Sequence, residues 1–362
     1  MKGRKWVAMT GLRHAGKALL YPAVLLFLLR IVFAGLLGMM PQEAYYFFYS
    51  RHPALSYYDH PPAIAWLLRL FTAVLGKHLI VLRLAATCTT LCTLAVFYFL
   101  ARKWLSPHRT IYALLLFFST FIITDLSLVS SPDVPLLLFW TLSLLSLHRA
   151  GFEGRISYWI WSGLMMGLAF DSKYTAIFLP MGLILFLILS KPYRRQLVSP
   201  GFFMALLFFL LTISPVLIWN ARNHFASFHF QSGERLQEIT GTGFHPEYFL
   251  GMLGHQAFVL IPVLFFFLLY FSVRRLRKAR FRPARIRPDS LFLLCFFLPL
   301  FTGFALVSMF YWVKMNWIMP AYISGIVWVS IYFKEKWLRR QWQASVLIHL
   351  ALAIEIIFYP FT

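Results

Sequence analysis

The sequence has few acidic residues and few charges of any kind. Lys and Arg number 34 against 12 Asp and Glu, and charged residues make up 13% of the 362 positions, whereas hydrophobic residues make up 60%. A soluble globule of this length needs more polar side chains to cover its surface. The composition therefore excludes an ordinary soluble domain and indicates a protein whose solvent is a lipid bilayer.

Cysteine is scarce, and several enzyme motifs are absent. Cys88, Cys92 and Cys295 all fall within apolar stretches, at spacings that suit neither a zinc site nor a disulfide framework, so we interpret them as buried structural thiols. The sequence contains no phosphate-binding P-loop, no dinucleotide-binding motif and no serine triad. Their absence argues against an enzyme that uses a soluble nucleotide-sugar donor.

What the sequence does contain is a series of long apolar stretches. Each is close to the roughly 20 residues that a helix needs to cross a hydrocarbon core, and backbone groups in lipid must be paired internally. We therefore predict an all-α fold, a polytopic transmembrane helical bundle of about eleven spans. The predicted spans lie near residues 19–40, 80–101, 109–127, 132–148, 156–170, 173–190, 200–219, 249–271, 290–311, 317–333 and 343–359.

Basic residues concentrate in alternate loops between these stretches. The N-terminus, which we interpret as the start of a retained signal anchor, shares one side with the run from Arg274 to Arg287 and with the other basic loops. By the positive-inside rule this side is cytoplasmic. The run VRRLRKARFRPARIR is therefore interpreted as a topology signal that contacts anionic membrane lipids, and not as a nucleic-acid-binding patch.

Acidic residues mostly fall on the opposite, outer side. Membrane insertion does not require acidic residues to lie on one side. Their concentration on the outer side therefore suggests a polar site at the outer face. The acids assigned to that face are Glu43, Asp59, Asp125, Asp133, Asp171, Glu234, Glu238 and Glu247.

We predict a single domain, residues 1–362. A site is expected in its two long outer segments, residues 41–79 and 220–248. In the first, an amphipathic helix from about Ala63 to Leu75 is too short to span comfortably and is predicted to lie flat at the membrane interface. The aromatic residues 45–49 suit a second interfacial helix, with a simple aromatic belt as the alternative.

The motifs EAYY from Glu43 and SRHPALSYYDHPP from Ser50 resemble the first outer loop of a family of bacterial membrane glycosyltransferases, those related to protein O-mannosyltransferases and to the lipid A aminoarabinose transferase. Further similar pieces follow in the expected order, and the resemblance covers most of the chain. They are SSPDVPLLLFW around Asp133, GLAFDSKYTA around Lys173, PVLIWNARNHFASFHFQ from Pro215 and NWIMPAYI from Asn316. The resemblance implies a GT-C fold like that of glycosyltransferase family 39.

The resemblance implies an inverting glycosyltransferase that moves a sugar from a polyprenyl-phosphate-linked donor to a lipid, glycan or protein acceptor. The expected place is the extracytoplasmic face of the bacterial inner membrane. An acceptor hydroxyl needs a base, which a carboxylate supplies, and the departing lipid phosphate needs a cation or metal beside it. The alternatives are a transporter or flippase for a lipid-linked sugar, or a non-catalytic paralogue.

The resemblance places the paired acids of the family on Gln42 and Glu43. The first acid, the usual base candidate, is an amide here, and an amide does not accept a proton at neutral pH. The predicted catalytic residues are therefore Glu43 and Asp133. The alternative for both is an acid that stabilises the N-terminus of a helix.

The remaining predicted site residues follow from the same motifs. Asp59 matches an acidic metal-site position, with a hydrogen-bonded turn as its alternative role, so a divalent metal is an option and no cofactor is assigned. Lys173 is the favoured phosphate cation, although an interfacial lysine with a solvated head group is the alternative. The residues predicted to bind the donor or its phosphate are Tyr57, Tyr58, His60, Lys173, Arg222, Arg235 and Lys314. Those predicted to bind substrate are Gln42, Tyr46, Asn316 and Trp317, the last with a membrane-anchoring role as its alternative.

Overall fold

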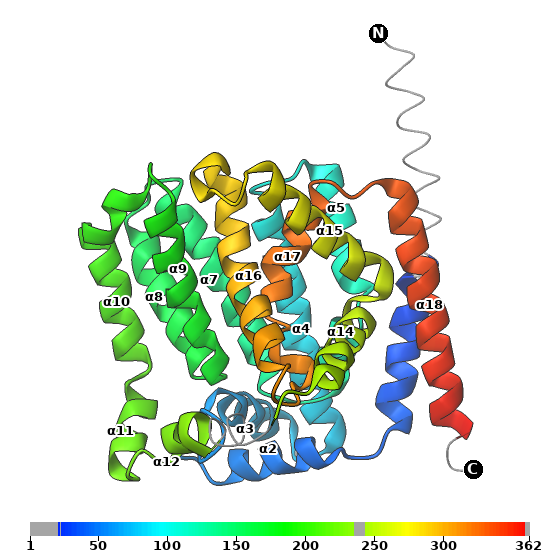
Figure 1. The fold of residues 1–362 in the computed structure, drawn as a ribbon. Helices are drawn as coiled ribbons and strands as arrows, with labels where there is room; N and C mark the ends of the chain where they lie inside the picture. Colours follow the sequence, from blue (N-terminus) through cyan, green and yellow to red (C-terminus); the bar gives the residue numbers. More distant parts are fainter. Residues whose placement is uncertain (1–20, 22, 235–242, 359–362) are drawn as a thin grey trace.

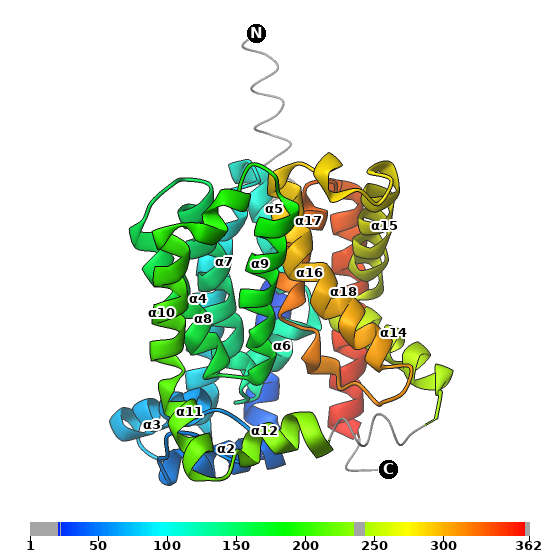
Figure 2. The ribbon, with the colours of Figure 1, turned by 60° about the vertical axis from the view of Figure 1, so that its left-hand side comes forward.

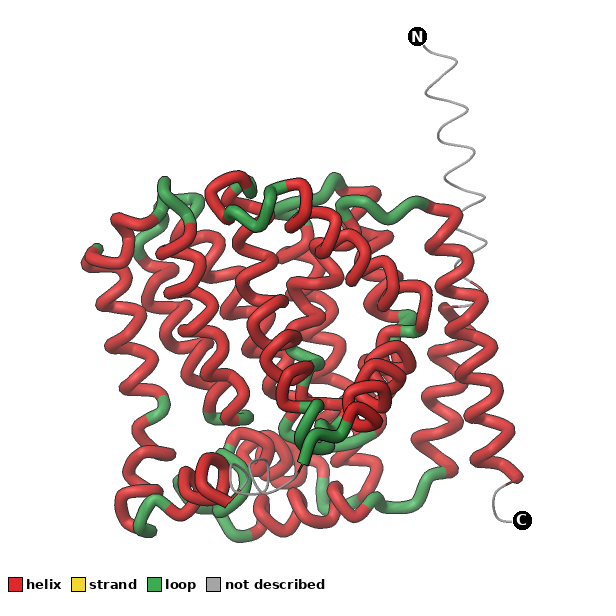
Figure 3. The backbone as a smooth tube through the Cα atoms, in the orientation of Figure 1, coloured by secondary structure: helices red, strands yellow, loops and turns green. Residues whose placement is uncertain are grey.

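The computed structural model describes residues 21, 23–234 and 243–358, and these residues form helices joined by short loops, with no strand among them (Figure 3). The prediction of an all-helical fold is confirmed. The first described helix is Ala23–Leu36. The helices that follow in the first half of the chain are α2 (Pro41–Arg51), α3 (Ala63–Leu75), α4 (Leu79–Ala101), α5 (Pro107–Phe118), α6 (Phe121–Leu128), α7 (Asp133–Gly151), α8 (Ser157–Phe170), η1 (Tyr174–Ile177) and α9 (Phe178–Leu189).

The second half continues the bundle. Its elements are η2 (Arg194–Val198), α10 (Pro200–Thr212), α11 (Ser214–Arg222), α12 (Ala226–Phe228), the π-helix η3 (His229–Glu234), α14 (Pro246–Leu260), α15 (Pro262–Lys278), η4 (Pro283–Arg285), α16 (Pro288–Val307), η5 (Met315–Trp317), α17 (Ala321–Ser330) and α18 (Glu335–Phe358).

The long helices stand side by side, and short elements cover one end of them (Figures 1 and 2). Helices α2, α3, α11 and α12 gather at the lower end in both views, whereas the arginine-rich loop after α15 lies at the upper end. The two long segments that were expected to carry a site therefore meet at the same end of the bundle.

Several predicted spans are broken in the structure. Among the described residues, three helices are long and apolar enough to cross a membrane alone, namely α4, α7 and α16, or up to seven spans if each bent helix pair counts as one. The prediction of about eleven continuous spans missed these bends. Residues 109–127 are split into α5 and α6 at 63°, residues 200–219 into α10 and α11 at 48°, and residues 249–271 into α14 and α15 at 112°.

The sharpest bend has an identifiable cause and a polar group that stabilises it. Ile261 has a positive φ of 66°, and Pro262 begins α15 without a backbone N–H to continue α14. The Gln341 side chain donates to the Leu260 carbonyl at 2.9 Å and accepts from the Leu264 N–H at 3.0 Å. One side chain from α18 thus satisfies backbone groups on both sides of the break, as a buried bend requires.

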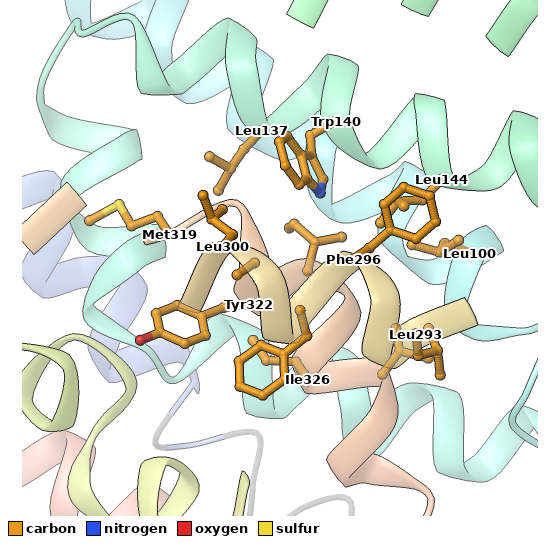
Figure 4. Close-up of a cluster of buried hydrophobic side chains, with 14 of the residues drawn as sticks. Leu100, Leu137, Trp140, Leu144, Leu293, Phe296, Leu300, Met319, Tyr322 and Ile326 are labelled. Carbon is orange, nitrogen blue, oxygen red and sulfur yellow. The ribbon is translucent and has the colours of Figure 1, made fainter. Parts of the chain in front are cut away.

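The core of the bundle lies between α7, α16, α17 and α4 (Figure 4). Trp140 from α7, Leu300 from α16 and Tyr322 from α17 are at most 1% exposed, and they belong to one continuous cluster of buried apolar side chains. This packing fixes the ends of the four helices relative to one another, including the end at which α7 begins.

Helices α2 and α3 form a smaller layer across the lower end. Helix α3 has the predicted bounds and is amphipathic, because Leu68 is 0% exposed whereas Val74 is 74% exposed. Its first residue, Ala63, donates its N–H to the Asp171 carbonyl at 2.9 Å. This bond ties the layer to the turn that follows α8.

Candidate functional site

A cavity of about 530 Å³ lies between the bundle and the α2–α3 layer, within the size range of small-molecule sites. Its walls come from segments that are far apart in the sequence. The polar and aromatic residues that line it include Gln42, Tyr46, His60, Asp125, Asp133, Lys173, Tyr174, Gln231, Tyr311, Lys314, Asn316 and Trp317.

Three of the predicted site residues form a hydrogen-bonded cluster in the cavity wall. The Lys173 ammonium donates to both oxygens of Asp133, at 2.8 and 3.1 Å, and the Asn316 amide donates to Oδ2 of Asp133 at 2.6 Å. Asp133 is 1% exposed and Lys173 is 6% exposed. A buried pair with this additional donor holds its groups in a fixed geometry.

The backbone explains why these three side chains meet. Asp133 is the first residue of α7, where the helix dipole favours a negative charge. Lys173 lies in extended backbone between the end of α8 and η1, and Asn316 lies in the short helix η5. Three motifs that are separate in the sequence, around residues 133, 173 and 316, therefore converge at the cavity.

The YYDHPP segment forms an aromatic network beside the cavity. The Tyr49 hydroxyl donates to Oδ1 of Asp59 at 2.5 Å, and the Tyr57 ring stacks on Tyr49 with a centroid separation of 3.9 Å. Tyr46 and His60 line the cavity, whereas Tyr57 and Tyr58 do not. The network supports the shape of the loop. Tyr57 and Tyr58 do not contact the cavity, so their predicted role in donor binding has no support from this placement.

The Asp59 position does not provide a metal-ligand set. Its Oδ2 lies 4.0 Å from Nε2 of His60, and within the described ranges no group of three or more His, Cys, Asp or Glu side chains is arranged to hold a metal ion. Structural metal sites need more ligands than one such pair supplies. Asp59 and His60 therefore do not form a metal site by themselves.

Glu43 is separated from the cavity. It is 0% exposed, accepts hydrogen bonds from Nε and Nη2 of Arg83 at 3.4 and 3.2 Å, and accepts the Met40 N–H at 3.0 Å. It does not line the cavity, although its neighbour Gln42 does. The other donors of Arg83 reach backbone carbonyls of the preceding turn, those of Ala34, Leu37 and Gly38. This placement favours the alternative role, an acid that stabilises the start of α2.

The second outer segment packs over the YYDHPP loop. The Ser227 hydroxyl donates to the Tyr57 carbonyl at 2.8 Å, and the Gln231 amide donates to the Asp59 carbonyl at 2.8 Å. Gln231 also lines the cavity. Of the predicted phosphate-binding arginines, Arg222 is exposed at the end of α11 and does not line the cavity, and Arg235 lies outside the described residues.

The structure adds two acids that the motifs did not single out. Asp125 lines the cavity from α6, and Asp171 is 1% exposed in the turn after α8. Burial raises the pKa of Asp171 to about 8, and in the described part of the chain neither of its carboxyl oxygens has a hydrogen-bond partner. In the sequence, both residues were assigned only to the group of outer-face acids, and Asp171 also lies in the GLAFDSKYTA piece without a role of its own.

The fold and this cavity define a polytopic integral membrane protein with a polar site at one end of its helical bundle, and known proteins share this architecture. Residues 59–219 match the family described as dolichyl-phosphate-mannose-protein mannosyltransferase. The crystal structure of ArnT from Cupriavidus metallidurans bound to undecaprenyl phosphate superposes with a TM-score of 0.65 and 19% identity, covering 96% of this chain and 65% of that one.

Two curated proteins are also similar to this chain. Lipid A galacturonosyltransferase RgtD of Rhizobium johnstonii is 26% identical over 82% of this chain and 60% of its own length. The undecaprenyl phosphate-alpha-4-amino-4-deoxy-L-arabinose arabinosyl transferase of Pseudomonas aeruginosa is 31% identical over 46% of this chain and 32% of its own length. The resemblance predicted from the outer-loop motifs is confirmed. The chain spans less than two thirds of the length of either relative.

Proposed function

We propose that this protein is a glycosyltransferase that moves a sugar from a polyprenyl-phosphate-linked donor to a lipid acceptor of the lipid A type. The observation that carries the proposal is the cluster of Asp133, Lys173 and Asn316 in the cavity wall. The chain is similar to two transferases whose names specify lipid A or undecaprenyl phosphate.

The cluster suits the chemistry of a departing phosphate. When the bond between the sugar and the lipid phosphate breaks, negative charge develops on the phosphate oxygens, and a fixed cation in a site of low polarity stabilises it. Lys173 is held in place by Asp133, and Lys314 lines the same cavity as a second, more exposed cation. Tyr46 and Trp317 offer aromatic faces against which a sugar ring can pack.

The proposed orientation places this cavity on the extracytoplasmic side. The N-terminus and the arginine-rich loop between α15 and α16 are then cytoplasmic, as the positive-inside rule predicts. A reporter fused after Arg287 should read as cytoplasmic and one fused after Asn223 as extracytoplasmic. The reverse pattern would move the site to the cytoplasmic face and exclude an extracytoplasmic acceptor.

The deciding experiment is sugar transfer by the purified protein in lipid nanodiscs. The donors to test are undecaprenyl phosphate that carries 4-amino-4-deoxy-L-arabinose and a polyprenyl phosphate that carries galacturonic acid, with lipid A as the acceptor. Mass spectrometry should detect the glycosylated acceptor together with the released polyprenyl phosphate. Donor binding without transfer would support a non-catalytic paralogue, and donor movement across proteoliposomes without transfer would support a flippase.

A further inference from the structure

Among the described residues, two carboxylates line the cavity, and only that of Asp133 is engaged by hydrogen bonds. Asp133 is occupied by the Lys173 ammonium and the Asn316 amide. Asp125 lines the same cavity, and across the ranges that the structure describes its carboxylate has neither a hydrogen bond nor an ion pair. It lies near enough to Asp133 and Lys173 to interact with both charges. A carboxylate in this position is available to a ligand.

The rotation of α6 directs Asp125 into the cavity. The preceding residue, Thr124, is buried on another face, where its hydroxyl accepts hydrogen bonds from Arg30 at 2.9 and 3.0 Å and contacts Nε2 of His349 at 2.7 Å. Successive residues of a helix point about 100° apart, so fixing Thr124 also fixes Asp125. Phe121, one turn earlier on the same helix face as Asp125, lines the cavity as well.

Helix α6 is also held at its C-terminal end. The hydroxyls of two threonines on α4 donate to its carbonyls, Thr87 to Ser127 at 2.8 Å and Thr90 to Leu126 at 2.9 Å. The break before α6 separates it from α5 by 63°, so α6 follows its own direction toward the cavity. Asp125 is therefore presented from a rigid element, as a catalytic group must be.

The two positions at which the family resemblance places paired acids, residues 42 and 43, are less suitable for proton transfer. Gln42 lines the cavity but is an amide, and Glu43 is paired with Arg83 away from it. We propose that Asp125 is the general base of this transferase and supplies the carboxylate that Gln42 does not provide. This inference rests on the proposed function.

In the proposed step, one bond to the anomeric carbon forms while another breaks. The acceptor hydroxyl oxygen forms a bond to the anomeric carbon of the sugar, and its proton passes to the Asp125 carboxylate. The bond between the anomeric carbon and the phosphate oxygen breaks, and its electron pair leaves with the polyprenyl phosphate. Asp125 then returns the proton to water. No oxidant, reductant or metal is required.

The test compares Asp125→Asn with a matched variant, Asp289→Asn, in the donor and acceptor assay described above. Asp289 lies at the start of α16, beside the arginine-rich loop, and does not line the cavity. We expect Asp125→Asn to lower turnover by roughly 10² to 10⁴-fold and Asp289→Asn to keep the parental rate. Binding of undecaprenyl phosphate to Asp125→Asn, measured by thermal shift, should match the parental protein and shows that the variant is folded.

A second variant separates a base from a structural acid. Asp125→Ala leaves space beside the acceptor, so added formate should restore part of the turnover if the missing group is a base, and should have no effect on a structural defect. Parental turnover by Asp125→Asn, or an absence of formate rescue in a folded, donor-binding Asp125→Ala, would overturn the assignment while leaving the transferase function intact. Failure of the parental protein to transfer any sugar would instead overturn the proposed function.

Discussion

Glu43 with Arg83 and Asp133 with Lys173 are two buried carboxylate–cation pairs, each joining residues 40 positions apart. The two pairs differ in the groups that surround them. Arg83 directs its remaining donors to backbone carbonyls and Glu43 does not reach the cavity, whereas Asp133 and Lys173 both line it. The same pair of charges therefore stabilises the 71° bend before α2 in one place and forms part of the cavity wall in the other. The surroundings of each pair decide its role, and the charges alone do not.

For these two pairs, the largest expected effect is the loss of sugar transfer when the cation at the cavity is removed. Lys173→Met removes the fixed cation of the cavity, so sugar transfer should fall by roughly 10² to 10³-fold because the departing phosphate loses its stabilising charge. The measurement is turnover per folded molecule in the transfer assay. Lys191→Met, an exposed lysine after α9, is the matched control and should keep the parental rate. Parental turnover by Lys173→Met would remove the distinction between the two pairs.

The next effect concerns stability. Arg83→Met leaves the Glu43 carboxylate buried without its cation, which should lower the free energy of unfolding by about 3–5 kcal/mol. Thermal unfolding followed by tryptophan fluorescence measures it, and the double variant Glu43→Gln with Arg83→Met should regain part of the loss. Arg155→Met, at an exposed ion pair, is the control. A folded Glu43→Gln variant that loses turnover at parental stability would show instead that Glu43 is catalytic.

A smaller effect concerns Asp171, a buried acid that forms no ion pair within the part of the chain that the structure describes. Its folded-state pKa of about 8 lies above the ordinary value of 3.8, so the folded state retains a proton that the unfolded state has released. The stability that this proton contributes is complete below pH 4 and is lost as the pH rises through 8. Asp171→Asn should therefore flatten the decline of the melting temperature between pH 6 and 9. An identical pH profile for both proteins would contradict this.

The smallest effect comes from an exposed pair. Glu153 bonds to Lys103 in the loops at the end of the bundle opposite α2 and α3, and the Lys103 ammonium lowers the pKa of Glu153. The stability that this ion pair contributes is present above the unfolded-state pKa of Glu153 and is lost as the pH falls through the folded-state pKa. Glu153→Gln should change the free energy of unfolding at neutral pH by at most about 1 kcal/mol, and less in high salt. A salt-independent loss of several kcal/mol would contradict this.

Much of the fold followed from apolar periodicity, and the bends did not. The interfacial helix from Ala63 to Leu75 was predicted at its observed bounds, because its amphipathic pattern is local. The 112° bend before Pro262 depends on Gln341, a side chain from another helix that completes the backbone hydrogen bonds there. A local pattern contains no information about such a partner.

The candidate site was also predicted in part. The motifs around Asp133, Lys173 and Asn316 were identified from the resemblance, and the structure brings them together. For Glu43, stabilisation of a helix start was predicted as the alternative role. Its pairing with Arg83 was not predictable, because Arg83 lies on the next long helix and no spacing rule links the two residues. Asp125 was visible only as one acid among several on the outer side, since the direction of its side chain depends on how Thr124 is held.

The three-part cluster also has a consequence for the order in which the chain is synthesised. Asp133 and Lys173 are synthesised before Asn316, and they lie at the two ends of the α7–α8 hairpin that face the α2–α3 layer. Their bond can form as soon as that hairpin packs. Asn316 follows only after α14, α15 and α16 have been made. The site therefore stays incomplete until η5 has been synthesised and has brought Asn316 to Asp133. The order of the residues along the chain allows the charged pair to form before its third member has been made.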